Sequence, residues 1–422
     1  MINKKKSLLI LGANSAIVDI VQTVQRMGYY AIVTDYLKDS PAKKIADESW
    51  MLSIDDVDGI VQKCKERNVD GVMNFCIDPG QKPYQEICSK LGLPCVAGFE
   101  QFNIMTNKDV FKKTCQKYGI DTIQEFNIDY KSPHLSDLCF PVIFKPVDGR
   151  ASKGLKISYG NETIKSDLEY SLSFSKTKKV VCEKLMKGYP EVQIKYLAVD
   201  GHFFITSISD WDTCYLKDGT RVYVDCIVYP SKYSSEYINS CNDKVVNMLS
   251  SIGIKNGAIA LTAFYDNGKF RFFDPALRMG GAQDWRIVRD VSGIDISECL
   301  ANYAITGSMG NIEHIKKIDK AFLKKYSCQL YVDVFAGEIG FIDGIEESLN
   351  IKGVIGIMQS HNVGDEIKGY GTTDNVAIRF FISCETKRQL ISAIKQIKSS
   401  VVINNIDGNN MIVSDYNLDL LN

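Results

Sequence analysis

A lysine inside an apolar strand signal, followed by a glycine-bounded loop, is the first pattern here that could do chemistry. Lys145 lies in that strand signal, and the loop Gly149–Gly154 holds Ser152 and Lys153. The glycine spacing equals that of a Walker phosphate loop, but neither Lys-Ser/Thr nor a helix signal follows. A β-hairpin that folds over phosphates with its N–H groups fits better. An exposed basic turn beside a snorkelling lysine is the alternative interpretation.

A second apolar strand signal ends in charged residues. The run 180–185 closes with Glu183, Lys184 and Leu185, and a Gly-Tyr-Pro turn leads from it to Glu191. A strand end of this kind can present backbone groups to the edge of an adenine and leave an acid for a ribose.

The third pattern is a hairpin with an acid at the end of its second strand. Asp-Asn-Gly at 266–268 lies between two apolar strand signals, which predicts a tight turn. Asp274 ends the second strand, where a carboxylate is costly without a cation partner. Because hard cations prefer carboxylate oxygens, Asp274 is a candidate Mg²⁺ ligand. Arg278 and the pair Gly280-Gly281 behind it suit an anion.

The N-terminal third alternates strand and helix signals, which predicts a parallel, Rossmann-like sheet with helices on both faces. The strand signals are 7–11, 31–35, 71–75 and 94–97, and the helix signals are 15–27, 57–67 and 83–91.

From residue 107 onward the signals predict α+β structure with antiparallel strands. The helix signals are 107–118 and 387–399, and the strand signals are 141–147, 155–158, 180–185, 195–199, 202–207, 259–265, 269–273, 329–335, 353–358 and 377–383.

Two N-terminal loops could bind ligands. The turn at Gly12 lacks the GxGxxG spacing, so a structural turn is favoured over a nicotinamide site although Asp35 ends the second strand. The loop 74–80, which holds Asp78, follows the third strand at the carboxyl edge of the sheet, where ligands of open α/β sheets bind. A substrate loop and a plain Pro-Gly turn are equally good interpretations of it.

The order and spacing of these patterns resemble the ATP-grasp superfamily over roughly residues 5–310, in the manner of carboxylate–amine (amino-acid) ligases and carbamoyl-phosphate-synthase-like members. The tail resembles, more loosely, the C-terminal domain of amino-acid-ligase-like members. The resemblance implies both α/β and α+β parts, and it implies three domains. These are a Rossmann-like pre-ATP-grasp domain at 1–104, a two-subdomain ATP-grasp fold at 105–310 (105–182 and 183–310), and a small α+β domain at 311–422.

The same resemblance implies how ATP would be bound. Lys108 matches the family's first nucleotide lysine and Lys145 its second, and both would reach the phosphates. The residues implied for the phosphate loop are Ser152, Lys153 and Gly154, those for adenine are Glu183, Lys184 and Leu185, and Glu191 is implied for the ribose.

For the metal and the chemistry, the resemblance assigns Asp274 to Mg²⁺, which Mn²⁺ could replace, and Arg278 and Lys145 to catalysis. Thr262 stands where the family has its first metal acid, and Ala276 where it has an asparagine. A three-residue hairpin loop would set Thr262 opposite Asp274. A hydroxyl is the poorer ligand, but Mg²⁺ takes further oxygens from substrate phosphates and water.

The activity implied is that of an ATP-dependent ligase. A carboxylate would attack the γ-phosphoryl of ATP, and an amine would displace phosphate from the acyl phosphate to give an amide. The protein would mainly position the reactants and neutralise charge. Thr262 and Ala276 support the main alternative, a protein that binds nucleotide without ligation. A third alternative, an NAD or sugar-nucleotide enzyme, lacks its glycine fingerprint.

The substrates are the least visible part of the function. Arg286 and Arg289 could clamp a carboxylate or could be helix-surface charges, and Asp78 is a further weak candidate. An amino acid is the first expectation, because the tail resembles amino-acid ligases.

The composition argues against nucleic acid and membranes as binding partners. The 422 residues include 50 Lys plus Arg against 51 Asp plus Glu, which gives a net charge of −1 and no footprint for nucleic acid or an anionic membrane. No apolar run is long enough to span a bilayer. The 13 cysteines form no CxxC motif, which favours a reducing cytoplasm over a disulfide or zinc framework. The resemblance implies small-molecule carboxylate and amine substrates as the partners, and a homodimer is a possible assembly.

Overall fold

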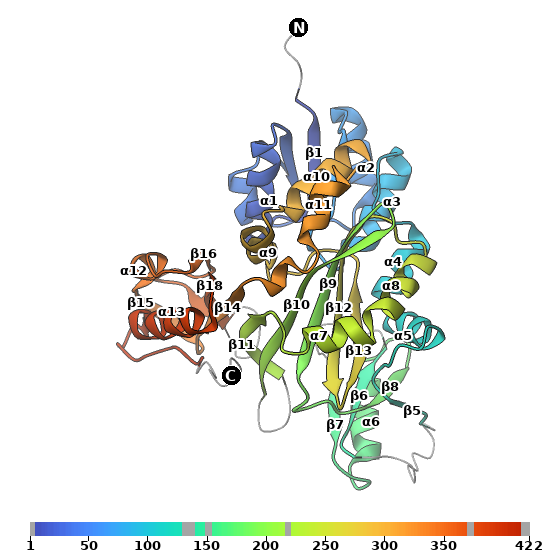
Figure 1. The fold of residues 1–422 in the computed structure, drawn as a ribbon, viewed down its shortest axis with the longest axis vertical. Helices are drawn as coiled ribbons and strands as arrows, with labels where there is room; N and C mark the ends of the chain where they lie inside the picture. Colours follow the sequence, from blue (N-terminus) through green and yellow to red (C-terminus); the bar gives the residue numbers. More distant parts are fainter. Residues whose placement is uncertain (1–4, 129–139, 148–153, 216–220, 369–374, 415–422) are drawn as a thin grey trace.

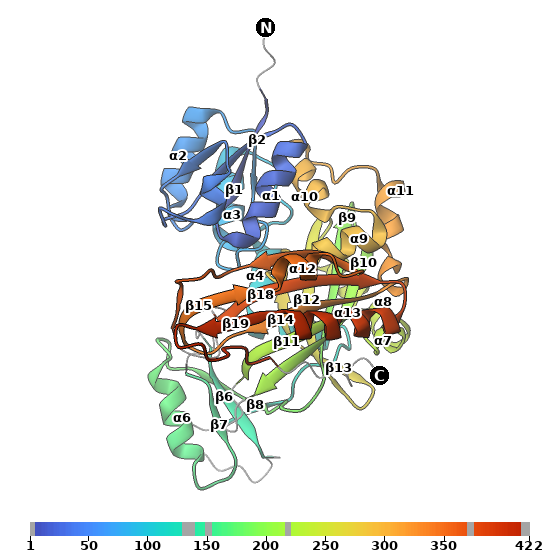
Figure 2. The same cartoon turned by 90° about the vertical axis from the view of Figure 1, so that its left-hand side faces the viewer.

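The computed structural model describes residues 5–128, 140–147, 154–215, 221–368 and 375–414. Figure 1 shows an N-terminal unit at the top, a long sheet through the middle, a small sheet at the bottom and a C-terminal unit at the side. Turned by 90°, the C-terminal strands lie in front of the middle of the molecule (Figure 2).

The N-terminal unit is a parallel sheet with strand order β3-β2-β1-β4, covered by helices. The predicted Rossmann-like arrangement is confirmed. Its elements are β1 (Ser7–Leu11), α1 (Ser15–Arg26), β2 (Tyr30–Thr34), η1 (Pro41–Lys44), β3 (Glu48–Trp50), α2 (Val57–Arg67), β4 (Gly71–Met73), α3 (Gln81–Leu91) and α4 (Phe99–Thr106).

The strand predicted at 94–97 is wrong, because these residues form no strand and the fourth member of the sheet is β3. Pro94 has no N–H to donate to a strand ladder. The Val96 N–H donates instead to the Tyr84 hydroxyl at 3.3 Å. With three residues, β3 is too short for its side-chain pattern to be read from the sequence.

A small antiparallel sheet with order β5-β8-β6-β7 follows. It consists of β5 (Glu125–Phe126), β6 (Val142–Pro146), β7 (Lys156–Ser158) and β8 (Val180–Lys184), with α6 (Ile164–Ser173) packed on it. Val142 and Phe144 of β6 lie in one core with Leu168 of α6. Because side chains alternate along a strand, Lys145 projects to the opposite face.

The largest sheet has eight antiparallel strands in the order β13-β12-β9-β10-β11-β14-β18-β16. Its strands are β9 (Glu191–Val199), β10 (His202–Tyr215), β11 (Arg221–Tyr229), β12 (Gly257–Asp266), β13 (Lys269–Ala276), β14 (Tyr326–Asp333), β16 (Val354–Gln359) and β18 (Val376–Cys384). The sheet thus continues across residue 310, where a domain boundary is expected from the sequence.

Helices cover both faces of this sheet. On one face, Ile194 of β9 shares a core with Val245 of α8 (Asn242–Ser251), beside α5 (Lys108–Lys117) and α7 (Ser234–Ser240). On the other face, Leu197 shares a core with Trp285 of α9 (Trp285–Ser292), beside α10 (Ile296–Thr306) and the N-terminal unit. The face that carries α9 is the one relevant to the site below.

The C-terminal unit adds the sheet β17-β15-β19 and packs α13 on β14 and β18 through residues such as Leu390 and Ile394. Its further elements are β15 (Gly337–Asp343), α12 (Ile345–Leu349), β17 (Glu366–Ile367), α13 (Lys387–Ser400) and β19 (Val402–Asn405). Between α10 and β14 the chain forms α11 (Ile312–Ile315), η2 (Lys316–Ile318) and η3 (Ala321–Leu323), and Ile315 and Ile318 share the core of α1 and α10. In the described part of the chain, none of the helices combines the length and apolarity that crossing a bilayer requires.

Candidate functional site

The β12–β13 hairpin sets Asp274 opposite Thr262, as predicted. Asn267 and Gly268 form a two-residue turn with φ of 48° and 85°, the conformation of a type I′ turn. That turn alone would pair Thr262 with Phe273. A β-bulge after Thr262 shifts the register by one residue and brings Asp274 into the pair. The predicted pairing is therefore confirmed, but a two-residue turn plus a bulge produces it, in place of a three-residue loop.

Lys108 contacts Asp274. The Lys108 Nζ lies 2.6 Å from Asp274 Oδ1, and both side chains are about half exposed to solvent. Lys108 can reach the hairpin because α5 begins there, capped by the Asn107 side chain, which accepts the Asp109 N–H at 3.1 Å. Two residues assigned from the sequence to phosphate and metal are thus in contact. An exposed pair of this kind is weak, so it can open when other charges arrive.

Glu183 is buried between two lysines. Its carboxylate lies 2.6 Å from the Lys145 Nζ and also contacts Lys112 of α5, which in turn contacts Glu125. Burial, together with the charges of Lys108 and Lys112, lowers the pKa of Lys145 to about 7, although the Asp274 and Glu125 charges raise it. Lys145 can therefore take up a proton at neutral pH when an anion binds.

At the end of β8, two backbone N–H groups and the Glu183 carboxylate already have partners within the protein. The Lys184 N–H donates to the Gln124 carbonyl at 3.0 Å, and the Leu185 N–H donates to the Pro141 carbonyl at 3.1 Å. Since the Glu183 carboxylate is engaged by lysines, an adenine contact at this strand end would fall to backbone groups.

Lys184 and Glu191 lie on either side of the turn after β8. The Lys184 Nζ stands 4.6 Å from the centre of the Tyr189 ring and 3.5 Å from Asp266. Glu191 begins β9, is buried, and accepts a hydrogen bond from the Thr213 hydroxyl at 3.4 Å.

Position 154 requires a glycine, because its backbone conformation and its neighbours leave no room for a side chain. It has a φ of 78°, and a Cβ there would lie 2.5 Å from the Phe174 Cβ and 2.7 Å from the Pro146 Cγ. Ser152 and Lys153, the other residues assigned to the phosphate loop, lie outside the described residues. The expectation of a loop that moves over phosphates therefore stays a prediction.

Arg278 is held by the N-terminal unit. Its Nε donates to Asp78 Oδ1 at 3.0 Å, and its Nη1 donates to the Met279 carbonyl at 2.8 Å. The Met279 N–H donates to the Phe75 carbonyl at 3.0 Å. The loop 74–80 is thereby docked on the segment after β13, so two of the sequence candidates, Asp78 and Arg278, meet.

Arg286 and Arg289 do not join this group. The Arg286 Nε and Nη2 donate to the two carboxylate oxygens of Asp19 at 2.6 Å each, and its Nη1 donates to the Ile357 carbonyl at 3.1 Å. Arg289 lies 3.2 Å from Asp295. Both arginines point from α9 toward the N-terminal unit and α10. The carboxylate clamp predicted for Arg286 is therefore filled by Asp19.

The Asp35 carboxylate binds backbone N–H groups of the loops next to it. Its carboxylate accepts the Ala13 N–H at 3.2 Å and the Leu37 N–H at 2.8 Å. A Cβ on Gly12, which has a φ of 86°, would lie 2.7 Å from the Ile77 Cγ1. These contacts give both residues a structural purpose and agree with the turn interpretation.

Two buried cations were missed in the sequence. Lys195 of β9 lies 2.6 Å from Asp284, and both side chains are almost fully buried. Arg379 of β18 stacks on the Tyr331 ring at 4.3 Å and donates to the Gly281 carbonyl at 3.2 Å. Both cations therefore meet the segment that follows Arg278.

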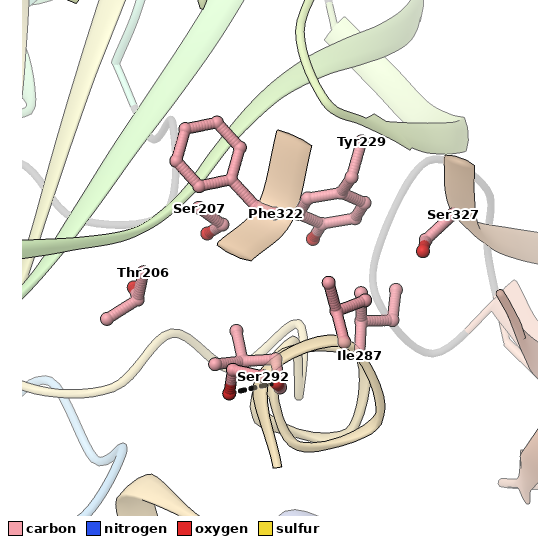
Figure 3. Close-up of a pocket in the computed structure, with 9 residues that line it drawn as sticks. Thr206, Ser207, Tyr229, Ile287, Ser292, Phe322 and Ser327 are labelled. Carbon is pink, nitrogen blue, oxygen red and sulfur yellow. Dashed lines mark hydrogen bonds between the residues drawn. The ribbon is translucent and has the colours of Figure 1, made fainter. Parts of the chain in front are cut away.

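A small cavity lies between the sheet and α9 (Figure 3). It is lined by residues that include Ser207, Tyr229, Ile287, Phe322 and Ser327, and its volume is ≈ 10 Å³. Such a volume holds about one water molecule. It is too small for a substrate.

Comparisons with known sequences give partial matches. No family model matches this chain. A formate-dependent phosphoribosylglycinamide formyltransferase of Francisella tularensis is 25% identical over 198 residues, which are 42% of this chain and 48% of that protein. The carbamoyl phosphate synthase large chain of Thermoanaerobacter pseudethanolicus is 23% identical over 168 residues, 39% of this chain and 16% of that one. The chain spans about half the length of the formyltransferase that it matches.

Solved structures match over nearly the whole chain. An L-amino acid ligase from Bacillus licheniformis has a TM-score of 0.76 at 19% identity and covers 95% of this chain and 99% of its own. A phosphoribosylglycinamide synthetase from Anaerococcus prevotii has a TM-score of 0.75 at 20% identity, and the match covers 95% of this chain and 100% of the synthetase. A biotin carboxylase from Campylobacter jejuni has a TM-score of 0.74 at 16% identity, and the match covers 99% of this chain and 95% of the carboxylase.

These relatives and structural neighbours are ATP-grasp carboxylate–amine ligases, and this chain has the ATP-grasp fold. The resemblance and the mixed α/β fold stated from the sequence are confirmed. The fold match includes almost the whole of the synthetase and of the amino acid ligase.

Proposed function

We propose that the protein is an ATP-dependent ligase that joins a small carboxylate, such as an amino acid, to an amine. The observation that carries this proposal is the convergence of Lys108, Lys145 and Asp274 from three elements, α5, β6 and β13. Two cations beside an oxygen ligand are what a metal-bound polyphosphate needs. Two relatives in sequence are a formate-dependent phosphoribosylglycinamide formyltransferase and a carbamoyl phosphate synthase large chain, which agrees with carboxylate activation.

ATP would bind with its phosphates at Lys108, Lys145 and the loop that includes Ser152, Lys153 and Gly154. The adenine edge would face the backbone after β8, because the Lys184 and Leu185 N–H groups already have carbonyl partners. In the described part of the chain, the Met186 N–H has no acceptor, so this N–H and the Lys184 carbonyl are the groups we assign to adenine. Glu191 would meet the ribose.

The donor set suits Mg²⁺ and, less specifically, Mn²⁺. Asp274 offers a partly exposed carboxylate, and the Thr262 hydroxyl lies on the paired strand, where the Gln193 amide donates to it at 3.3 Å. Hard cations take such oxygens and complete their shell with phosphate and water. The metal would neutralise charge as the phosphoryl group moves, and Lys108 would be released from Asp274 toward the phosphates.

The protein side of the reaction is positioning. The carboxylate of the substrate would attack the γ-phosphoryl, with ADP leaving, and the amine would then displace phosphate from the acyl phosphate. Arg278, fixed by Asp78, would stabilise the transferred phosphoryl and the acyl group. We propose the domain limits 1–104, 105–310 and 311–422 for this machinery. We also propose a cytoplasmic location, which the eleven free cysteines of the described residues support, with a homodimer as the assembly to test.

A second candidate is a nucleotide-binding protein without ligase activity. Thr262 and Ala276 favour it, because they supply a hydroxyl and a methyl group where two polar metal contacts are expected. Such a protein would bind ATP and release no ADP with any carboxylate and amine.

The test is ADP release over a panel of carboxylates and amines, with mass spectrometry of the products. We expect Asp274→Ala to reduce turnover at least about 100-fold while the fold survives, because the change removes the one charge that joins protein and metal. Asp407→Ala, an exposed carboxylate in the loop after β19, is the matched control and should behave as wild type. Equal turnover in Asp274→Ala would refute the metal assignment.

A further inference from the structure

Helix α5 carries two lysines toward the proposed nucleotide site. Lys108 and Lys112 are four residues apart in α5, and side chains at that spacing lie on the same face of a helix. The Lys108 side chain is 63% exposed and contacts Asp274, whereas the Lys112 side chain is 6% exposed. Of these two lysines, Lys108 alone is open to a bound phosphate. Lys112 therefore needs a different explanation.

Lys112 stands within a chain of alternating charges. It contacts the Glu125 carboxylate on one side and the Glu183 carboxylate on the other, and Glu183 also lies 2.6 Å from the Lys145 Nζ. The Glu183 side chain is 4% exposed, so solvent screens its charge little. Helix α5 and strand β6 thus bring two cations to one buried carboxylate.

The two cations on Glu183 differ in their freedom to leave it. Lys112 contacts Glu183 Oε1 and Lys145 contacts Oε2, so each lysine has its own carboxylate oxygen. The Lys145 side chain is about one third exposed, whereas Lys112 is enclosed. Lys145 can therefore turn away from Glu183 while Lys112 stays in place. The Lys112 charge also lowers the pKa of Lys145, because like charges repel.

A departure of Lys145 would be costly if Glu183 had no second cation. A buried charge that loses its partner is strongly unfavourable. To reach the phosphates of ATP, Lys145 has to give up its contact with Glu183. The Lys112 ammonium group offsets the cost of this step, because it remains beside the carboxylate.

We propose that Lys112 is a positioning residue that keeps Glu183 neutralised while Lys145 leaves this carboxylate for the phosphates of ATP. The inference rests on the proposed nucleotide site and adds to it a residue that touches no part of the ligand. Nucleotide binding is then an exchange of ion pairs. Lys108 leaves Asp274, Lys145 leaves Glu183, and Lys112 is the cation that stays.

Titration calorimetry with Mg²⁺ and a non-hydrolysable ATP analogue tests this exchange. Lys112→Met roughly keeps the length of the side chain and removes its charge. Lys113→Met, at the exposed next position of α5, is the matched control. We expect Lys112→Met to weaken binding at least about tenfold at a pH of about 6.5, because Glu183 then holds Lys145. Lys113→Met should bind within about twofold of wild type.

The pH dependence separates this role from a packing role. Without the Lys112 charge, the pKa of Lys145 rises, so Lys145 keeps its proton to higher pH. Wild type must protonate Lys145 on binding near pH 9 and the variant need not, so the difference in affinity should narrow as the pH rises. The other charged groups near Lys145, which include Lys108, Asp274 and Glu125, are the same in both proteins.

A Glu183→Gln background provides the second readout. There, Lys112→Met should change the affinity by less than about twofold, because no buried carboxylate holds Lys145. A loss that persists in this background, or that is equally large at every pH, would mean that Lys112 only supports packing, and it would overturn the inference. If Lys112→Met does not fold, Lys112→Gln takes its place with the same expected loss.

The same titrations separate this inference from the proposed function. Wild-type protein that binds no nucleotide would overturn both. Tight binding by wild type and by Lys112→Met alike would overturn the inference and leave the proposed function standing.

Discussion

Lys145 should make ATP binding depend on pH. Burial and the neighbouring Lys108 and Lys112 charges lower its pKa to about 7, so it is mostly neutral in the free protein at pH 8. Polyphosphate favours the protonated form, and binding at that pH must therefore take up a proton. We expect the ATP dissociation constant to rise with pH between 7 and 9, by at most about tenfold per unit. Titration calorimetry at several pH values, in buffers of different ionisation enthalpy, measures both the affinity and the proton uptake.

Lys145→Arg is the control for this dependence, because a guanidinium keeps its charge throughout the range. Its affinity should be nearly independent of pH. Lys145→Ala should weaken ATP binding at least about tenfold at pH 7, which is about 1.4 kcal/mol. Parallel pH curves for wild type and Lys145→Arg would show that Lys145 is not the titrating group.

At the level of single residues, the sequence reveals charged groups in apolar strands but not what they meet. Lys145 was singled out because it lies in an apolar strand signal, and Lys195 and Arg379 carry the same signal. Their partners, Asp284 and Gly281, come from one segment that is about 90 residues from Lys195 and 98 residues from Arg379 in the chain. Such long-range contacts depend on how the strands pair, which no local pattern reports.

At the level of elements, the β12–β13 hairpin offers a test of the metal site. Its bulge brings Thr262 opposite Asp274, so a carboxylate at 262 would share a cation with Asp274. We expect Thr262→Glu to lower the Mg²⁺ concentration for half-maximal ADP release, by roughly three- to tenfold, because a carboxylate is the stronger oxygen ligand. The measurement is ADP production against Mg²⁺ concentration.

Thr262 is buried, so the larger side chain could disturb packing. Thr262→Gln has nearly the same size as Thr262→Glu without the charge and is the matched control. It should need at least as much Mg²⁺ as wild type. If the glutamine and glutamate variants respond alike, the side chain at 262 does not reach the metal.

Regular elements were predicted well wherever their pattern was long enough. α2 was placed at its observed bounds, and α1, α5 and α13 within a residue or two of theirs. The register of the hairpin could not be derived in full, because a bulge leaves no mark in the sequence comparable to that of an Asn-Gly turn. β11 was missed, and β10 extends eight residues beyond its predicted end. Their polar inward residues, Asp225 among them, break the alternation that marks a strand.

At the level of the whole molecule, a mostly buried ion pair joins the N-terminal unit to α9. Arg286 binds Asp19 of α1 through two hydrogen bonds of 2.6 Å while it also bonds the Ile357 carbonyl of β16. Both charged side chains are mostly buried. We expect Asp19→Asn to lower the free energy of unfolding by about 1–3 kcal/mol, because a buried guanidinium loses a charged acceptor. Urea unfolding followed by tryptophan fluorescence measures the change.

Arg289→Gln is the comparison for that measurement. Its pair with Asp295 is half exposed, so its loss should cost less than about 1 kcal/mol. Equal effects of the two substitutions would mean that Asp19 does not bind the units together. Neither variant should change ATP affinity, because both pairs lie apart from Lys108 and Lys145.

The continuous eight-stranded sheet also limits how such a gene can be recombined. Residues 226–229 of β11 pair with 327–330 of β14, and β14 and β18 bring Tyr331 and Arg379 to the segment that follows Arg278, where the acyl group would lie. If recombination between two genes joined them near residue 310, β11 from one protein would have to pair with β14 from the other. These two strands would not have evolved together. Such an exchange would also set Tyr331 and Arg379 of one protein beside that segment of the other, while leaving the nucleotide site in place. We therefore expect substrate preference to change in evolution by point substitutions on β14 and β18. We expect the C-terminal part to be exchanged between related genes only together with the strands that precede it in the chain.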